Sequence, residues 1–141
     1  MRDREAAEKR GHTAETVALW FLRLKGYRLL ARRFKCAAGE VDLVMRKGAT
    51  TAFIEVKARA TVDDAVIAVT PRLSKRISAA AANWMARDSK AAAGHCRFDI
   101  VAVSSNFRPT HIENAFYGDR QSHGPFRCGP DGPDHGDRHF R

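Results

Sequence analysis

Residues 39–57 decide the fold, and they read Gly-Glu-Val-Asp-Leu-Val-Met-Arg-Lys-Gly-Ala-Thr-Thr-Ala-Phe-Ile-Glu-Val-Lys. Two strand-like runs flank Gly48-Ala49, and a two-residue loop with glycine first is the type II′ turn of a β-hairpin. This turn pairs Lys47 with Thr50. Counting back from the turn sets Val44 opposite Phe53, Asp42 opposite Glu55, and Glu40 opposite Lys57.

The hairpin brings two carboxylates together on one face. Because side chains alternate along a strand, Glu55 and Lys57 point to the same face of the sheet. Asp42, which lies opposite Glu55 on the neighbouring strand, points to that face too. Facing carboxylates would have Cβ atoms about 4.5–5.5 Å apart and would repel each other. A divalent cation offsets this repulsion, since Mg²⁺ prefers oxygen ligands and is commonly held by one or two carboxylates. Lys57 can reach an attacking water or a phosphate oxygen, which is typical of a metal-dependent phosphodiesterase.

A structural interpretation of the same face is an exposed ion pair between Glu40 and Lys57. Both runs, however, carry apolar residues on both faces, as Val44 and Phe53 show beside the carboxylates. Such strands are typical of the interior of a covered sheet, where unpaired carboxylates are costly. Face geometry alone leaves both interpretations open.

Four blocks of the chain resemble a known family. They are Gly-Glu-Val-Asp-Leu-Val, a short turn and Phe-Ile-Glu-Val-Lys-Ala-Arg within residues 39–59, Gly11-His12-Thr13-Ala14-Glu15, Phe98-Asp99-Ile100-Val101, and His111-Ile112-Glu113-Asn114-Ala115-Phe116. From about Gly11 to Tyr117 the sequence is similar to the YraN-like family of uncharacterised bacterial proteins, with a restriction-endonuclease-like fold and the PD-(D/E)xK nuclease signature. The resemblance implies an α/β fold in which a central mixed β-sheet is flanked by α-helices.

The resemblance also implies roles for single residues. Asp42 and Glu55 become ligands of Mg²⁺ or Mn²⁺, Lys57 becomes the catalytic lysine, and Glu15 becomes a supporting acid from the first helix. From its position at the edge of the apolar stripe alone, Glu15 can lean toward a neighbouring site or face water. One block departs from the family pattern. After Thr70-Pro71 the family usually has a lysine and then a glutamine before a basic pair, and this chain reads Arg72-Leu73-Ser74-Lys75-Arg76.

Apolar periodicity and capping residues predict two long helices. The first is expected over roughly residues 4–25 and ends at Gly26. Thr70-Pro71 predicts the start of the second, with threonine as the N-cap and proline at the first helical position. Its buried stripe runs from Leu73 to Met85.

Three further strands are expected at residues 27–34, 98–103 and 110–116. Asp99 lies in the second of them among apolar neighbours, and we expect a buried, hydrogen-bonded structural acid. Residues 60–69 contain no strong signal and are expected to form a mobile connection beside the site.

The chain is basic, with a net charge of +9 at pH 7. Residues 1–117 hold 21 Lys and Arg against 12 Asp and Glu, an excess of 21 − 12 = 9, whereas residues 118–141 hold four of each. Clustered positive charge favours a polyanionic partner, because neutralised phosphates release counterions. We therefore expect nucleic acid as the partner, DNA rather than RNA, with a solvated basic face as the alternative. The expected binding residues are Arg28, Arg32, Arg33, Lys35 and Arg59.

Composition predicts one domain at residues 1–117, followed by a disordered tail rich in Gly, Pro and His at residues 118–141. The first thirty residues lack the apolar core of a signal peptide, and no apolar run approaches the roughly 20 residues that span a bilayer. We therefore expect a cytoplasmic protein without a membrane partner.

These observations predict a Mg²⁺- or Mn²⁺-dependent nuclease that hydrolyses phosphodiester bonds in nucleic acid. Two alternatives stay open. One is a nucleic-acid-binding module that keeps the nuclease-like fold without turnover, and the other is an adaptor whose basic face meets an acidic protein.

Overall fold

The computed structural model describes residues 2–116, and the tail predicted at residues 118–141 lies outside them. Within the described residues the chain forms five strands and four helices. The strands are β1 (Arg28–Cys36), β2 (Gly39–Lys47), β3 (Thr50–Ala58), β4 (His95–Val103) and β5 (Pro109–Ile112). The helices are α1 (Arg2–Leu24), α2 (Val62–Ala68), α3 (Pro71–Arg87) and α4 (Ser89–Ala93).

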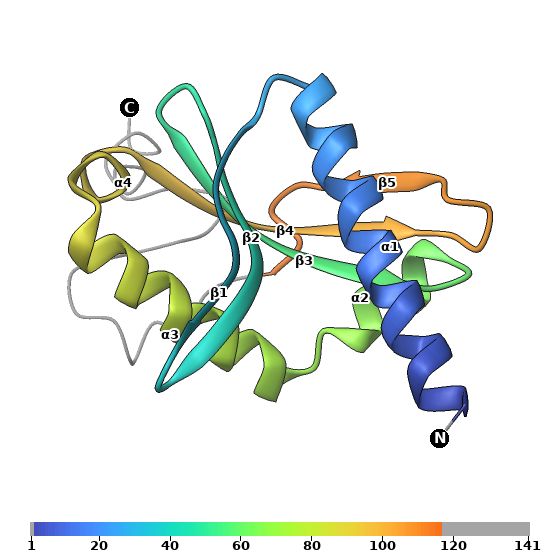
Figure 1. Cartoon of the computed structure of the whole chain (residues 1–141). Coiled ribbons are helices and arrows are strands. Elements are labelled where there is room, and N and C mark those ends of the chain that lie inside the picture. Colours follow the sequence, from blue (N-terminus) through green and yellow to red (C-terminus); the bar gives the residue numbers. More distant parts are fainter. Residues whose placement is uncertain (1, 117–141) are drawn as a thin grey trace.

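The strands form one mixed sheet in the order β1-β2-β3-β4-β5. Only β3 and β4 are parallel to each other, and the other neighbours are antiparallel. Figure 1 shows α1 crossing one side of the sheet, while α3 lies under the β1–β2 hairpin. The predicted α/β fold, with a central mixed sheet flanked by helices, is confirmed.

Two apolar clusters fill the layers on either side of the sheet. Beneath α1, Leu22 packs in one cluster with Ile54 of β3. Beneath α3, Ile77 packs in the other cluster with Phe53, the neighbour of Ile54 in the same strand. The central strands are therefore covered on both faces, as the apolar residues on each side of the carboxylates predicted.

Local chemistry sets the ends of the two long helices. Gly26 has a φ of 97° after α1, and the Tyr27 N–H donates to the Leu22 carbonyl at 3.0 Å, which together form a Schellman motif. At the start of α3, Thr70 Oγ1 accepts the N–H of Leu73 at 3.2 Å. Helix α1 therefore begins and ends within two residues of its predicted limits, and α3 begins at the predicted Pro71.

The mobile connection expected at residues 60–69 is wrong, because α2 occupies most of it. Thr61 caps this helix by accepting the Asp64 N–H at 3.1 Å, and Ala65 is buried against Ile100 of β4. The sequence does contain the cap and the acidic first turn, but seven residues are too few to show a helical period. The last strand is also shorter than predicted, since β5 ends at Ile112.

The β2–β3 hairpin has the register that its turn predicted, but only over part of its length. Lys47 pairs with Thr50, and the pairing continues to Leu43 opposite Ile54. Beyond this pair β2 stays with β1 and leaves β3, so that Glu40 faces Lys35 and not Lys57. At the far end of β2, a Cβ on Gly39 would lie 1.8 Å from the Arg76 carbonyl oxygen of α3, so the close approach requires glycine.

Candidate active site

The point at which β2 leaves β3 forms a fork in the sheet, and Asp42 is the first β2 residue beyond the paired region. Its Oδ2 accepts the backbone N–H of Val56 at 2.8 Å, in place of a further strand-to-strand hydrogen bond. Glu55 of β3 precedes Val56 and shares a hydrogen bond with the Asp42 carboxyl group. The fork therefore brings together the two carboxylates that the sequence predicted to meet.

The environment of Glu55 favours the neutral acid. The residue is only 6% exposed. Burial, together with the hydrogen bond and the negative charge of Asp42, raises the pKa of Glu55 to about 9. The Lys57 ammonium, with Nζ 3.6 Å from Glu55 Oε2, opposes this rise without cancelling it. At neutral pH Glu55 therefore keeps its proton.

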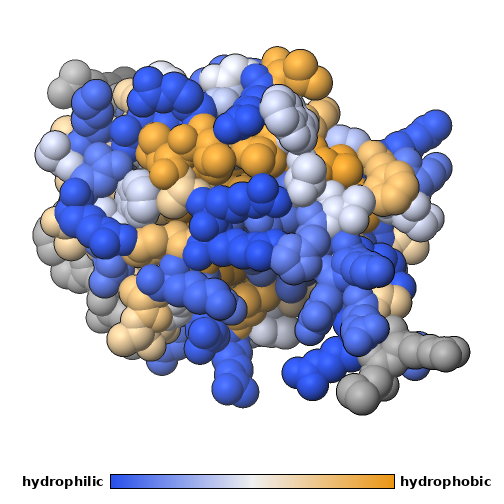
Figure 2. All heavy atoms as spheres, in the orientation of Figure 1, coloured by the Kyte–Doolittle hydropathy of each residue, from blue (hydrophilic) through white to orange (hydrophobic). Residues whose placement is uncertain are grey.

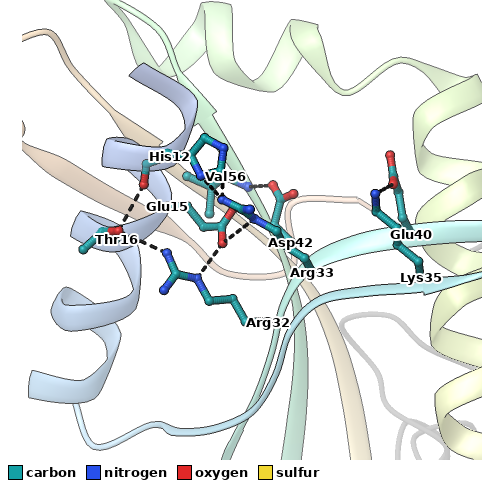
Figure 3. Close-up of polar contacts among 9 residues, drawn as sticks. All are labelled: His12, Glu15, Thr16, Arg32, Arg33, Lys35, Glu40, Asp42 and Val56. Atoms are coloured by element: carbon teal, nitrogen blue, oxygen red, sulfur yellow. Dashed lines mark hydrogen bonds and ion pairs between the residues drawn. The ribbon is translucent and has the colours of Figure 1, made fainter. Parts of the chain in front are cut away.

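A third carboxylate reaches the same place from α1. Glu15 is buried, and it accepts hydrogen bonds from Arg32 Nε at 2.7 Å and from Arg33 Nε at 3.1 Å. Arg33 reaches it from a backbone φ of 52°, which is uncommon for a residue other than glycine, and also contacts His12. Figure 3 shows Glu15 between α1 and the two arginines of β1, with Asp42 beside them. The charge of Glu15 is thus already balanced by two cations.

The three carboxylates line one hollow with a volume of about 400 Å³. Lys57 and Arg33 also line it, so the hollow contains both acidic and basic groups. The sequence prediction did not include the α1 residues Glu8, Gly11 and His12, which complete this wall. Their spacing of three to four residues, continued by Glu15, puts them on one face of a helix, and this signal could have revealed them.

The remaining basic residues predicted to bind nucleic acid have different surroundings. Lys35 is 72% exposed, and Figure 3 shows it with Glu40, apart from the Glu15 group. Arg28 is exposed at the start of β1, and Arg59 is exposed directly after β3. Figure 2 shows hydrophilic side chains across much of the face on which α1 lies, with hydrophobic side chains grouped near its upper centre. Lys35 is thus more exposed than Arg32 and Arg33, whose side chains are 40% and 43% exposed. Lys35, Arg28 and Arg59 are not paired with Glu15, whose partners are Arg32 and Arg33.

The donor set at the fork fits a hard divalent cation. Among residues 2–116, no group of three or more His, Cys, Asp or Glu side chains is arranged to hold a metal ion. Mg²⁺ does not require such a group, because it is commonly bound by one or two carboxylates and keeps several waters. Asp42 and Glu55 supply these oxygens, and a bound cation would oppose the burial and the Asp42 charge that raise the pKa of Glu55.

A third buried acid, Asp99, has surroundings that favour its charged form. Asp99 of β4 is fully buried, and Arg97 donates to it from Nε and Nη2, both at 2.8 Å. His111 Nε2 lies 2.8 Å from the same carboxylate, and the Asn114 N–H donates at 3.1 Å. Burial acts to raise the pKa of Asp99, but the hydrogen bonds from His111 and Arg97 outweigh it and hold that pKa below its usual value. Asp99 is therefore the hydrogen-bonded structural acid that the sequence predicted.

The fold and the fork define an α/β protein with a nuclease-like sheet and a cluster of carboxylates at its centre. Residues 14–103 match the sequence pattern of Uncharacterised protein family UPF0102, and the chain belongs to this family, which is the YraN family expected from the sequence. None of the helices within residues 2–116 is long and apolar enough to cross a membrane.

Similar proteins include UPF0102 proteins from three bacteria. That of Methylorubrum extorquens is 51% identical over 113 residues, which cover 80% of this chain and 88% of the relative. That of Rhodopseudomonas palustris is 49% identical over 113 residues, covering 80% of this chain and 87% of the relative. That of Mesorhizobium japonicum is 45% identical over 115 residues, covering 82% and 92%. These names state no activity.

Proposed function

We propose that this protein is a nuclease that uses Mg²⁺ or Mn²⁺ to hydrolyse phosphodiester bonds in nucleic acid, DNA rather than RNA, in the cytoplasm. One observation carries the proposal: at the fork, Glu55 is buried against Asp42 with a pKa raised to about 9, beside Lys57 in an accessible hollow. A strongly perturbed carboxyl in a cleft with a specific charge partner is a common mark of a functional site.

Asp42 and Glu55 would hold the cation. When bound, it supplies Lewis-acid polarisation of the phosphate and lowers the pKa of water. Glu55 gives up its proton on forming this site, so that both carboxylates act as anionic oxygen donors. Asp42 is fixed in position by the Val56 N–H, which limits the movement of its carboxylate.

Lys57 would act on the phosphate. Its ammonium lies 3.6 Å from Glu55 and lines the same hollow, so it can orient an attacking water and stabilise negative charge that develops on the phosphoryl oxygens. Glu15 would act indirectly, because it positions Arg33 at the wall of the hollow. There the guanidinium can contact a second phosphate oxygen.

The test is cleavage by the full chain of a panel of DNA and RNA substrates, single-stranded, duplex and branched, with Mg²⁺ or Mn²⁺. Lys57→Ala should slow cleavage by about 10²–10³-fold, as expected for loss of one group that stabilises the transition state. Its affinity for the same substrate should change far less, because the cation ligands and most phosphate contacts remain. Lys75→Ala on the exposed surface of α3 is the matched control and should cleave at the wild-type rate.

Three outcomes would contradict the proposal in whole or in part. If the wild type cleaves nothing in the panel yet binds nucleic acid with a steep dependence on salt, the chain is a binding module without turnover. If it neither cleaves nor binds, the adaptor alternative replaces both. If the Lys57 and Lys75 variants lose the same fraction of the cleavage rate, Lys57 has no specific role in the reaction.

A further inference from the structure

A second hollow lies at the carboxyl ends of the two parallel strands β3 and β4. Its volume is about 340 Å³, and Ala58 and Val103, the last residues of these strands, form part of its wall. The other main lining residues are Arg10 and Ala14 of α1, Arg59, and Phe107 of the β4–β5 connection. Figure 1 shows this connection at the edge of the sheet, where β4 ends. Ligands of open α/β sheets commonly bind beyond the carboxyl ends of the strands.

Phe107 presents an aromatic ring at this hollow. It is 59% exposed, and its φ of 59° lies in the left-handed region that a bulky side chain rarely adopts. Ser104 fixes the turn, since its carbonyl accepts the Phe107 N–H at 2.9 Å and its hydroxyl accepts the Arg108 N–H at 3.3 Å. These hydrogen bonds stabilise the turn and keep the ring outside the core, although phenylalanine is usually buried.

The two arginines at the hollow, Arg10 and Arg59, have no carboxylate partner in ion-pairing range among the described residues. This distinguishes them from Arg32 and Arg33, both of which are bound to Glu15. An apolar hollow with an exposed aromatic ring and two unneutralised guanidinium groups matches a ligand that has both a flat ring and anionic groups.

The second hollow adjoins the first along the chain. Lys57 lines the first and Arg59 lines the second, and two residues of extended chain span about 6.6 Å. Nucleotides in a stacked strand are spaced by about 3.4 Å. A strand with its scissile phosphate at Lys57 would thus bring a base one or two nucleotides away to the second hollow.

We propose that this second hollow binds an unpaired base of the nucleic-acid substrate, with Phe107 stacking on the base and Arg10 and Arg59 contacting the adjacent phosphates. The inference rests on the proposed function and adds the substrate class, which is nucleic acid with a single-stranded stretch next to the cleavage point. An intact duplex does not offer the site a free base face, because each base is covered by its stacked neighbours.

The experiment measures binding of the full chain to a fluorescent single-stranded DNA 12-mer in the presence of chelator, so that no cleavage occurs. Phe107→Asn is the main variant, because asparagine tolerates positive φ and keeps the turn while it removes the ring. It should weaken binding by about 5- to 150-fold, the usual cost of losing one aromatic stacking platform. Phe107→Trp retains a ring and should bind within a few-fold of the wild type.

Trp20→Ala is the matched control, since Trp20 of α1 is 58% exposed, nearly the same as Phe107, but lies outside the hollow. It should bind the 12-mer as the wild type does. A 12-mer of abasic sites has the same phosphates without bases, so the wild type and Phe107→Asn should bind it equally. Arg59→Gln, by contrast, should weaken binding to both oligomers and make log affinity less steep in log salt.

Wild-type affinity of Phe107→Asn for the base-containing 12-mer would overturn the inference, as would an equal loss in Trp20→Ala or no binding by the wild type. Failure of the proposed nuclease is distinguishable from this result, because binding is measured without a divalent cation. A chain that cleaves nothing but shows the Phe107 effect has the base site without the reaction. A chain that cleaves but shows no Phe107 effect has the reaction without the base site.

Discussion

Replacing Glu55 with glutamine removes a group that is neutral in the folded protein and ionised in the unfolded chain at neutral pH. Burial and the neighbouring Asp42 raise the pKa of Glu55 in the folded state to about 9, whereas its ordinary value is 4.5. Between these two values the folded protein binds one proton more than the unfolded chain at this position. The contribution of Glu55 to the free energy of unfolding is therefore fully present below about pH 4.5 and is lost as the pH rises toward 9.

The magnitude follows from the same two pKa values. Each pH unit between them costs the wild type about 1.4 kcal/mol, so about 2.5 units from 4.5 to neutrality amount to about 3 kcal/mol at pH 7. Glutamine has nearly the same shape as the neutral acid and does not ionise. Glu55→Gln should thus be about as stable as the wild type at pH 5 and more stable by about 3 kcal/mol at pH 7, with a further gain up to pH 9.

Urea unfolding in the presence of chelator, repeated at each pH unit from 5 to 9, measures this difference. Glu40→Gln is the control, since Glu40 lines the same hollow but its side chain is 48% exposed. Its stability should run parallel to that of the wild type across the whole range. If the curve for Glu55→Gln also runs parallel to the wild type, Glu55 is ionised in the folded protein and the account of the fork is wrong.

Three further experiments test the site and its surroundings. Mn²⁺ at about 100 times its dissociation constant should stabilise the wild type by about 2.7 kcal/mol in thermal unfolding and should not stabilise Asp42→Asn or Glu55→Gln; equal stabilisation of the variants would place the cation elsewhere. Glutamine at Arg28, Arg32 and Arg33 together should flatten the slope of log affinity against log salt by up to about 0.9 for each duplex phosphate that these arginines neutralise, and an unchanged slope would make them a solvated face. Asp99→Asn should lower the free energy of unfolding by about 3–5 kcal/mol in urea, because Arg97 loses its buried partner, whereas a neutral effect would deny Asp99 its structural role.

Much of the fold could be predicted because its strongest signals are local. The Gly48-Ala49 turn fixed five paired positions of the hairpin, and Gly26 and Thr70 marked helix ends that the structure confirms. The short helix α2 was missed because its stability comes from contacts that the sequence does not display. Ala65, for instance, is buried against Ile100, a residue 35 positions later in the chain.

The site was only partly predictable for the same reason. The alternation of side chains placed Asp42 near Glu55, but the turn does not reveal that β2 separates from β3 beyond Leu43, where β2 approaches α3 closely at Gly39. Glu40 therefore pairs with Lys35 and not with Lys57. The attachment of Arg32 and Arg33 to Glu15 likewise joins α1 to β1 across 17 and 18 residues, which no local pattern records.

The contrast between Asp99 and Glu55 favours a binding site at the fork over a structural ion pair. Asp99 receives hydrogen bonds from Arg97, His111 and a backbone N–H, and these donors hold its pKa down in spite of complete burial. Glu55 lies in the same sheet, yet its polar neighbours are another carboxyl group and one ammonium, and its pKa rises. The fold thus supplies guanidinium groups to Asp99 and to Glu15, whereas Glu55 has only the Lys57 ammonium among the described residues. In the proposed function, a cation bound between Asp42 and Glu55 would supply the missing positive charge and stabilise the folded protein at neutral pH, as a ligand does at its binding site.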